Sequence, residues 1–126
     1  MMDLPFLETS IKVRYDVLAD AVKDHFDNAL AATSAKAEIE KVVAILYAEG
    51  KVEGKNATAR DANVKVMLKD SYDCLEVLVE DERHAYLRKQ LAEIDVAKYR
   101  AILRIAELAD TEKQTTHYEK GEINVS

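Results

Sequence analysis

The positions of the few glycines and the one proline place the first limit on the fold of this chain. Its 126 residues include three glycines and one proline, and neither type occurs at 6–49 or at 55–120. Both intervals are rich in alanine, leucine, glutamate, lysine and arginine, which are the strongest helix formers. A chain with its breakers confined to its two ends and one short internal segment is predicted to form two long helices joined by a turn.

The turn between the helices is predicted at 50–57, which contains two of the three glycines. Helices are then expected over about 6–49 and about 58–110. Because a single short turn reverses the chain, the two helices run in opposite directions. The predicted fold is all-α, a long antiparallel helical hairpin with coiled-coil character.

The same pattern predicts the domain organisation. One domain is expected over 1–110, since no internal repeat divides the chain. Residues 111–126 are polar and include Gly121, and we predict a flexible tail there. Thr58–Asp61 has the spacing of a capping box and is predicted to open the second helix.

Apolar residues recur at helical spacing and mark the faces expected to pack. In the first helix they are Ile11, Tyr15, Leu18, Val22, Phe26, Ala29 and Thr33. The second helix carries two stripes on different faces: Leu68, Tyr72, Leu75 and Val79, and then Leu87, Leu91, Ile94, Ala101, Ile105 and Leu108. Either this helix kinks near 80–84, or its two halves pack on different partners. Two helices are too few to bury both stripes, so we expect a homo-oligomer, most simply a dimer with a four-helix arrangement.

Charge placement predicts a hairpin folded about Lys55. Basic residues are concentrated in 83–104, and folding about Lys55 places this stretch opposite four aspartates of the first helix. These are Asp16, Asp20, Asp24 and Asp27. Each exposed pair contributes only about 0.2–1 kcal/mol, so the match indicates register more than stability.

A second group of charges has no predicted partner within the hairpin. Asp70, Asp73, Glu76 and Glu80 fall on one face of the second helix. One interpretation is a solvated surface that keeps the chain soluble. The other is a docking face for a basic partner, in which the carboxylates mimic a phosphate backbone.

Overall composition narrows the classes of partner. The chain has 24 acidic and 18 basic residues and a net charge of −6, which argues against a general binder of nucleic acid or of anionic membranes. No apolar run reaches the length of about 18 residues that a membrane span needs, and the first ten residues lack a signal-peptide core. A single cysteine, Cys74, excludes an internal disulfide framework and suits a reducing compartment.

The glycine-containing turn resembles a phosphate-binding loop only superficially. It has three residues between its glycines where a P-loop has four, and Asn56 where the P-loop has serine or threonine. Lys51, Lys55 and Arg60 remain candidates for contact with an anion, beside free N–H groups at a helix start. The alternative is a solvated turn.

Neither a metal site nor a catalytic nucleophile is predicted. Glu80 and Asp81 precede His84 at the spacing of helical metal ligands, but the first helix offers no glutamate at matching depth on its main apolar stripe. We expect Cys74 to be a small packed residue and His25 a hydrogen-bonded core histidine. No enzymatic activity and no cofactor are expected.

Two stretches resemble a loose group of small phage and prophage helical proteins. Glu53–Arg60 contains their Gly-Lys-Asn-x-x-x-Arg turn, and Tyr99–Leu108 matches their late helix rich in leucine and arginine. The similarity covers about 40–108. It implies a phage-encoded, non-enzymatic accessory protein in the cytoplasm of a bacterial host.

These observations lead to two functional hypotheses. In the first, the chain binds a host or phage protein through its acidic helical face, as an inhibitor of a bacterial defence system (an anti-CRISPR protein, for example) would. In the second, it assists phage DNA replication or recombination and contacts DNA through the basic residues of 83–104 and through the turn with Lys55 and Arg60, with binding that weakens steeply in salt. Net charge favours the first, and a structural virion component is a third alternative.

Overall fold

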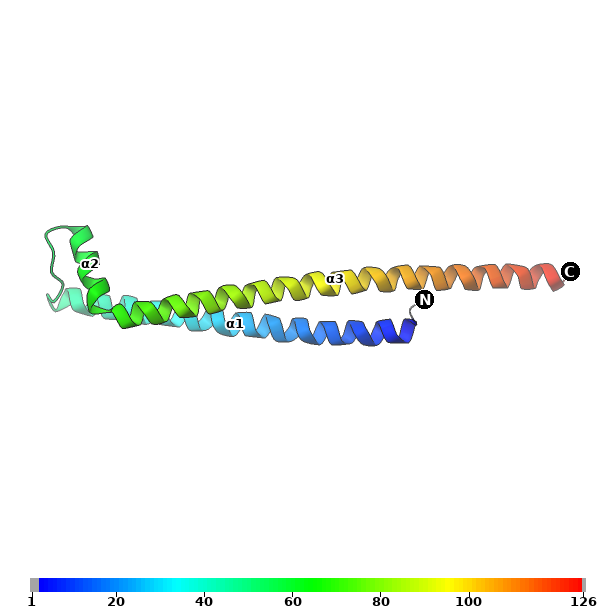
Figure 1. Cartoon of the computed structure of the whole chain (residues 1–126), viewed down its shortest axis with the longest axis horizontal. Coiled ribbons are helices and arrows are strands. Elements are labelled where there is room, and N and C mark those ends of the chain that lie inside the picture. Colours follow the sequence, from blue (N-terminus) through cyan, green and yellow to red (C-terminus); the bar gives the residue numbers. More distant parts are fainter. Residues whose placement is uncertain (1–2, 126) are drawn as a thin grey trace. The chain divides into compact units, whose positions relative to one another are not determined.

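The computed structural model describes the backbone of residues 3–125 and the side chains of residues 3–113. Three helices follow one another: α1 (Leu4–Ala48), α2 (Ala57–Met67) and α3 (Lys69–Val125) (Figure 1). The long helices α1 and α3 pack against each other, which confirms the predicted all-α helical hairpin. The dimeric four-helix arrangement remains a prediction.

Contacts within the chain divide it into two units, where the sequence predicted a single domain. Unit 1 combines Met1–Ala21 with Lys89–Ser126, and unit 2 comprises Val22–Arg88. Each unit therefore contains a stretch of α1 and a stretch of α3, and unit 2 contains α2 as well.

In unit 1 the facing residues of the two helices follow steps of three and four. From α1 they are Leu7, Ile11, Arg14 and Leu18, and from α3 they are Ala92, Val96, Tyr99, Leu103 and Ala106, all buried or half-buried. An average spacing of 3.5 residues keeps one face of each helix against the other along its length. Leu7 has no exposed surface and is the largest fully buried side chain among the described residues.

The core of unit 2 is built from smaller side chains. Its buried residues are Ala32 and Ile39 from α1, Val64 from α2 and Ala85 from α3. Burying an alanine removes little apolar surface from water, so this pairing gains less from the hydrophobic effect than one between leucines.

The predicted packing faces are only partly right. Of the stripe expected on α1, Ile11 is buried, but Tyr15, Val22 and Phe26 are exposed. The reason is the spacing, because the residues that face α3 keep a strict 3.5-residue repeat through smaller and polar side chains. The later stripe expected on α3, from Leu87 to Leu108, is exposed throughout.

Two glycines shape the connection between α1 and α2. Gly50 has φ of 68°, a left-handed conformation that ends α1 with little strain only for glycine. A Cβ atom at Gly54 would lie 2.6 Å from the backbone nitrogen of Arg60, so no larger residue fits there. The backbone N–H of Glu53 also donates to Oδ1 of Asn63 (3.0 Å), which ties the connection to α2.

The N-cap of α2 is Asn56, where the sequence predicted a capping box at Thr58–Asp61. Asn56 has extended backbone angles, and its Oδ1 accepts a hydrogen bond from the backbone N–H of Ala59 at 2.8 Å. Because this short amide satisfies a free donor of the first turn, the helix begins at Ala57 without the box.

The sequence predicted one continuous helix over about 58–110. This prediction is wrong in two respects, because the helix is interrupted at Leu68 and extends beyond residue 110. The chain turns at Leu68, which has φ −111° and ψ 28° and donates its N–H to the carbonyl of Val64. The turn lets Val64 become buried and Leu68 half-buried, so packing interrupts the helix where no glycine or proline does. Beyond it, α3 has no break at 80–84 and continues past residue 110 to Val125, since no proline interrupts it. Of the predicted tail, Ser126 lies outside the described residues.

Candidate functional site

One predicted pairing across the hairpin is present in unit 2. Arg88 donates from Nη2 to Oδ2 of Asp24 at 2.7 Å, and both side chains are about half exposed. This contact agrees with the prediction that the basic stretch 83–104 lies opposite the aspartates of the first helix, for one of the four aspartates. Asp24 also accepts a hydrogen bond from Nδ2 of Asn28, one turn along α1.

A half-buried polar cluster joins the two helices of the unit 1 pairing. Arg14 donates from Nη2 to the hydroxyl of Tyr99 at 2.8 Å, and its guanidinium carbon lies 4.1 Å from the centre of the same ring. Its Nε lies 3.0 Å from Oδ2 of Asp95, close enough for an ion pair but without the alignment of a hydrogen bond. The bond to Tyr99 raises the pKa of Arg14 above its ordinary value, against a smaller opposing effect of desolvation, so the group stays charged. A permanent cation held in this way fixes the helix register and has no evident role in proton transfer.

His25 is half-buried in unit 2, but the hydrogen bond predicted for it is absent among the described residues. Its ring centre lies 5.4 Å from that of Tyr86, with the planes tilted by 54°. Its Nε2 is 4.0 Å from Oε1 of Glu82, beyond hydrogen-bond distance. The sequence correctly placed His25 near the core, where the aromatic contact with Tyr86 accounts for its position.

The predicted acidic face is exposed on α3 in unit 2. Asp70, Asp73, Glu76 and Glu80 are all exposed. Asp73 and Glu76 form no hydrogen bond or ion pair with any residue that the structure describes, so their charge is available to a partner.

Glu80 differs from the other three acidic residues. Its Oε1 lies 3.3 Å from Nε2 of His84, and its Oε2 lies 3.8 Å from Nη1 of Arg83. The expectation that Glu80 lacks a partner within the chain is therefore wrong. Residues three and four positions further along a helix lie directly beside it and reach its carboxylate.

A groove of about 340 Å³ lies in unit 2 where α1 passes the start of α3. Its apolar lining is buried or half-buried, and its polar residues are exposed. The apolar residues are Ala35, Ile39, Val42 and Leu68, and the polar ones are Glu38, Asp70, Ser71 and Cys74. Apolar walls edged by two carboxylates suit the aliphatic stem and charged end of a lysine or arginine.

The sequence analysis identified only Asp70 among the polar residues of this groove. Glu38 could have been found, because folding the chain about Lys55 places residue 38 opposite residue 72. Cys74 was expected to be packed, but its thiol is free and exposed. It lies in the lining of the groove and is open to solvent.

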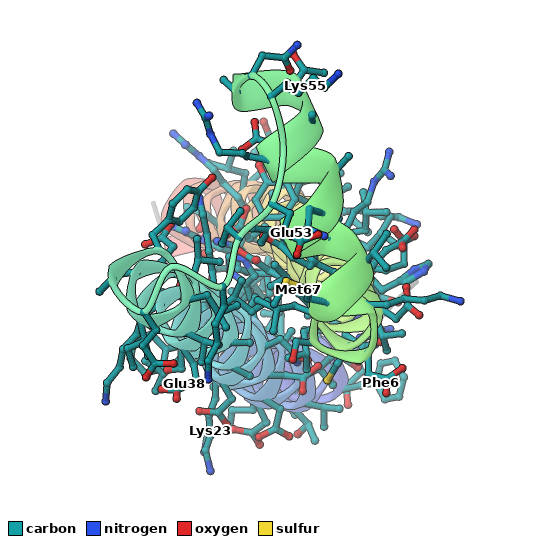
Figure 2. All side chains as sticks on the ribbon, turned by 90° about the vertical axis from the view of Figure 1, so that its left-hand side faces the viewer. Phe6, Lys23, Glu38, Glu53, Lys55 and Met67 are labelled. Carbon is teal, nitrogen blue, oxygen red and sulfur yellow. The ribbon has the colours of Figure 1, made fainter. Side chains whose placement is uncertain are left out.

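The structure does not assemble Lys51, Lys55 and Arg60 into an anion site. Lys51 Nζ pairs with Oε2 of Glu49 at 2.7 Å, and Lys55 lies exposed at the outer end of the connection to α2 (Figure 2). Arg60 is half-buried in the first turn of α2. Asn56 accepts the N–H group of Ala59 through its side chain and that of Arg60 through its backbone carbonyl.

Unit 1 contains a larger groove of different character. It has a volume of about 700 Å³ and is lined mainly by aliphatic residues of the first turn of α1 and of α3. Leu4, Pro5 and Leu7 contribute from α1, and Ile102 and Ile105 contribute from α3. The groove marks where α1 begins and α3 loses the cover of a partner helix.

No group of three or more histidine, cysteine, aspartate or glutamate side chains among the described residues is placed to hold a metal ion. Nor does any described helix carry an apolar stretch of the length needed to cross a bilayer.

Comparisons with protein families, with curated proteins and with solved structures find no match to this chain. The resemblance to phage accessory proteins therefore remains a prediction.

Proposed function

We propose that this chain is a non-enzymatic interaction protein that binds a basic segment of a partner protein at the acidic groove of unit 2. The main observation behind this proposal is that two exposed carboxylates, Glu38 and Asp70, lie at an apolar groove. Asp73 and Glu76, further along α3, have no ion pair with any described residue and extend the negative charge.

The two components of the groove have different roles in this proposal. Exposed carboxylates steer a basic partner and select against an acidic one, but each exposed ion pair contributes little affinity. Affinity comes mainly from the apolar lining, where Ile39, Val42 and Leu68 contact the stem of an inserted side chain. A protein segment that presents a long side chain with an aliphatic stem and a basic end matches both the apolar lining and the carboxylates.

The biological setting comes from the resemblance in the turn sequence. A phage-encoded accessory protein would use such a groove on a host or phage protein, for example to inhibit a bacterial defence system. Many proteins of that class bind nucleic acid, so they expose basic surfaces that an acidic groove complements.

The test is a pull-down from bacterial lysate with the tagged full chain, with and without nuclease. We expect a stoichiometric protein partner that survives nuclease and is lost with Glu38→Lys/Asp70→Lys, which reverses both carboxylates of the groove. The matched control is Asp20→Lys/Asp27→Lys, which changes net charge equally at exposed positions of α1. Helical content by circular dichroism confirms that both variants are folded.

Two outcomes would overturn the proposal. Equal capture by both variants would show that the acidic groove is not the docking surface. Partners that vanish with nuclease would instead favour the DNA hypothesis and direct attention to Lys98, Arg100 and Arg104. These three are exposed on α3 and pair with no described residue.

A further inference from the structure

A second surface, in unit 1, repeats heptad spacing on the outer side of α3. Its large residues are Leu91, Ile94, Ile105 and Leu108, each between 59% and 68% exposed. Lys98 and Ala101 occupy the two positions between them, so the steps along the helix are three, four, three, four and three. At 100° per residue this stripe lies nearly opposite the Ala92 and Val96 face that packs on α1.

The order of these steps is the same in both directions along the helix. Reversing the stripe places Leu91 on Leu108, Ile94 on Ile105, and Lys98 on Ala101. In a two-fold symmetric pair, residue i of one copy meets residue j of the other, and j meets i. A stripe that maps onto itself in this way, with leucine on leucine and isoleucine on isoleucine, is self-complementary for an antiparallel pair.

Charge at the centre of the stripe selects the antiparallel orientation. In a parallel pair Lys98 would face Lys98 of the second copy, placing like charges opposite each other in an apolar layer. In the antiparallel pair its aliphatic stem lies over the small Ala101 of the second copy, and its ammonium group reaches solvent. At the edges of this pair Asp95 falls near Ile102, and Arg104 falls near Ala97, so neither meets a like charge.

The exposed area also approaches what a dimer needs. The four large side chains together present roughly 400–500 Å² of apolar surface, about half of what each partner contributes to a standard stable interface. A patch of this size matches the largest apolar patch of a typical monomer, about 300–600 Å², which often marks an interaction site.

We propose that unit 1 is a self-association surface, on which a second copy of this chain packs α3 against α3, antiparallel, along 91–108. This inference does not rest on the acidic groove, which belongs to unit 2. Self-association and partner binding can therefore fail independently of each other.

Sedimentation equilibrium of the full chain over a concentration series tests the oligomeric state. We expect a dimer, and we expect Ile94→Lys/Ile105→Lys to raise its dissociation constant ~100-fold or more. Val66→Lys/Val77→Lys, which changes two exposed valines of unit 2 in the same way, should leave the dimer intact. Ile94→Ala/Ile105→Ala provides a milder variant in case the charged one does not fold. A monomer at all concentrations, or a dimer that survives both outer-face variants, would overturn the proposal.

Cysteine cross-linking tests the orientation. In a Cys74→Ser background, chains with Leu91→Cys are mixed with chains carrying Leu108→Cys and oxidised. Antiparallel packing brings these two positions within the Cα separation that a disulfide requires, so the mixture should give the mixed dimer. Cross-links of the Leu91→Cys chain to itself, with no mixed product, would show parallel packing and refute the register.

Discussion

The inner and outer faces of α3 in unit 1 differ in an unexpected way. The inner face, against α1, carries Ala92, Val96 and the polar Tyr99, whereas the outer face carries leucine or isoleucine at four of its six stripe positions. Larger apolar side chains are thus left in water while smaller ones are buried. Hydrophobic size alone therefore does not decide which face of α3 packs on α1. The spacing of the repeat, the close approach of the two helices that small side chains allow, and the Arg14–Tyr99 contact also contribute.

The strongest test of this contrast compares two neighbouring residues at the start of α1. Leu7 is fully buried and Phe6 is 59% exposed. We expect Leu7→Ala to lower the free energy of unfolding by about 2–4 kcal/mol, through lost burial and a residual cavity. Phe6→Ala should change it by less than about 0.5 kcal/mol, as for most exposed positions.

Urea unfolding followed by circular dichroism measures both values. The comparison is made in the Ile94→Lys/Ile105→Lys background, where the proposed association cannot contribute to stability. Equal losses for the two variants would show that the helices do not pair through Leu7, and the inner face would have to be reassigned.

A smaller effect is expected when an alanine on each face is enlarged. Ala92 is buried against α1, so Ala92→Leu should overpack the pairing and cost about 1–3 kcal/mol. Ala101 is exposed on the outer stripe, and Ala101→Leu should leave the unfolding of the single chain nearly unchanged. The same urea titrations distinguish the two, and destabilisation by Ala101→Leu in the non-associating background would contradict the assignment of faces.

Some of this arrangement could be read from the sequence and some could not. The two long helices followed from the distribution of glycine and proline, and the placement of the basic stretch 83–104 opposite the aspartates of α1, as in the Asp24–Arg88 pair, followed from charge. The interruption at Leu68 could not be read, because it results from the burial of Val64 and has no local breaker. Helical periodicity identifies a stripe, but it cannot tell whether the partner of that stripe lies in the same chain or in another.

The same limit applied to the candidate site. Asp70 was found because acidic residues cluster along one helix, whereas Glu38 belongs to the other helix and enters the site only through the hairpin register. Local patterns on a single helix are visible in a sequence. A site formed by two helices can be predicted only once the register between the helices is known. Here that register was predicted from a few exposed charges.

The smallest expected effect concerns the Asp24–Arg88 ion pair at the edge of the unit 2 pairing. Because both side chains are about half exposed, the pair should contribute only about 0.2–1 kcal/mol, and less at high salt. Asp24 also accepts a hydrogen bond from Asn28, so a single Asp24→Ala change would overstate the pair. A double-mutant cycle with Arg88→Ala removes that contribution and leaves the coupling between the two charges. A coupling above about 2 kcal/mol, unchanged by salt, would mean that the pair is shielded from water. The exposed edge of the α1–α3 pairing would then stabilise the fold as much as its buried face does. The contrast between buried and exposed surfaces would not hold at this position.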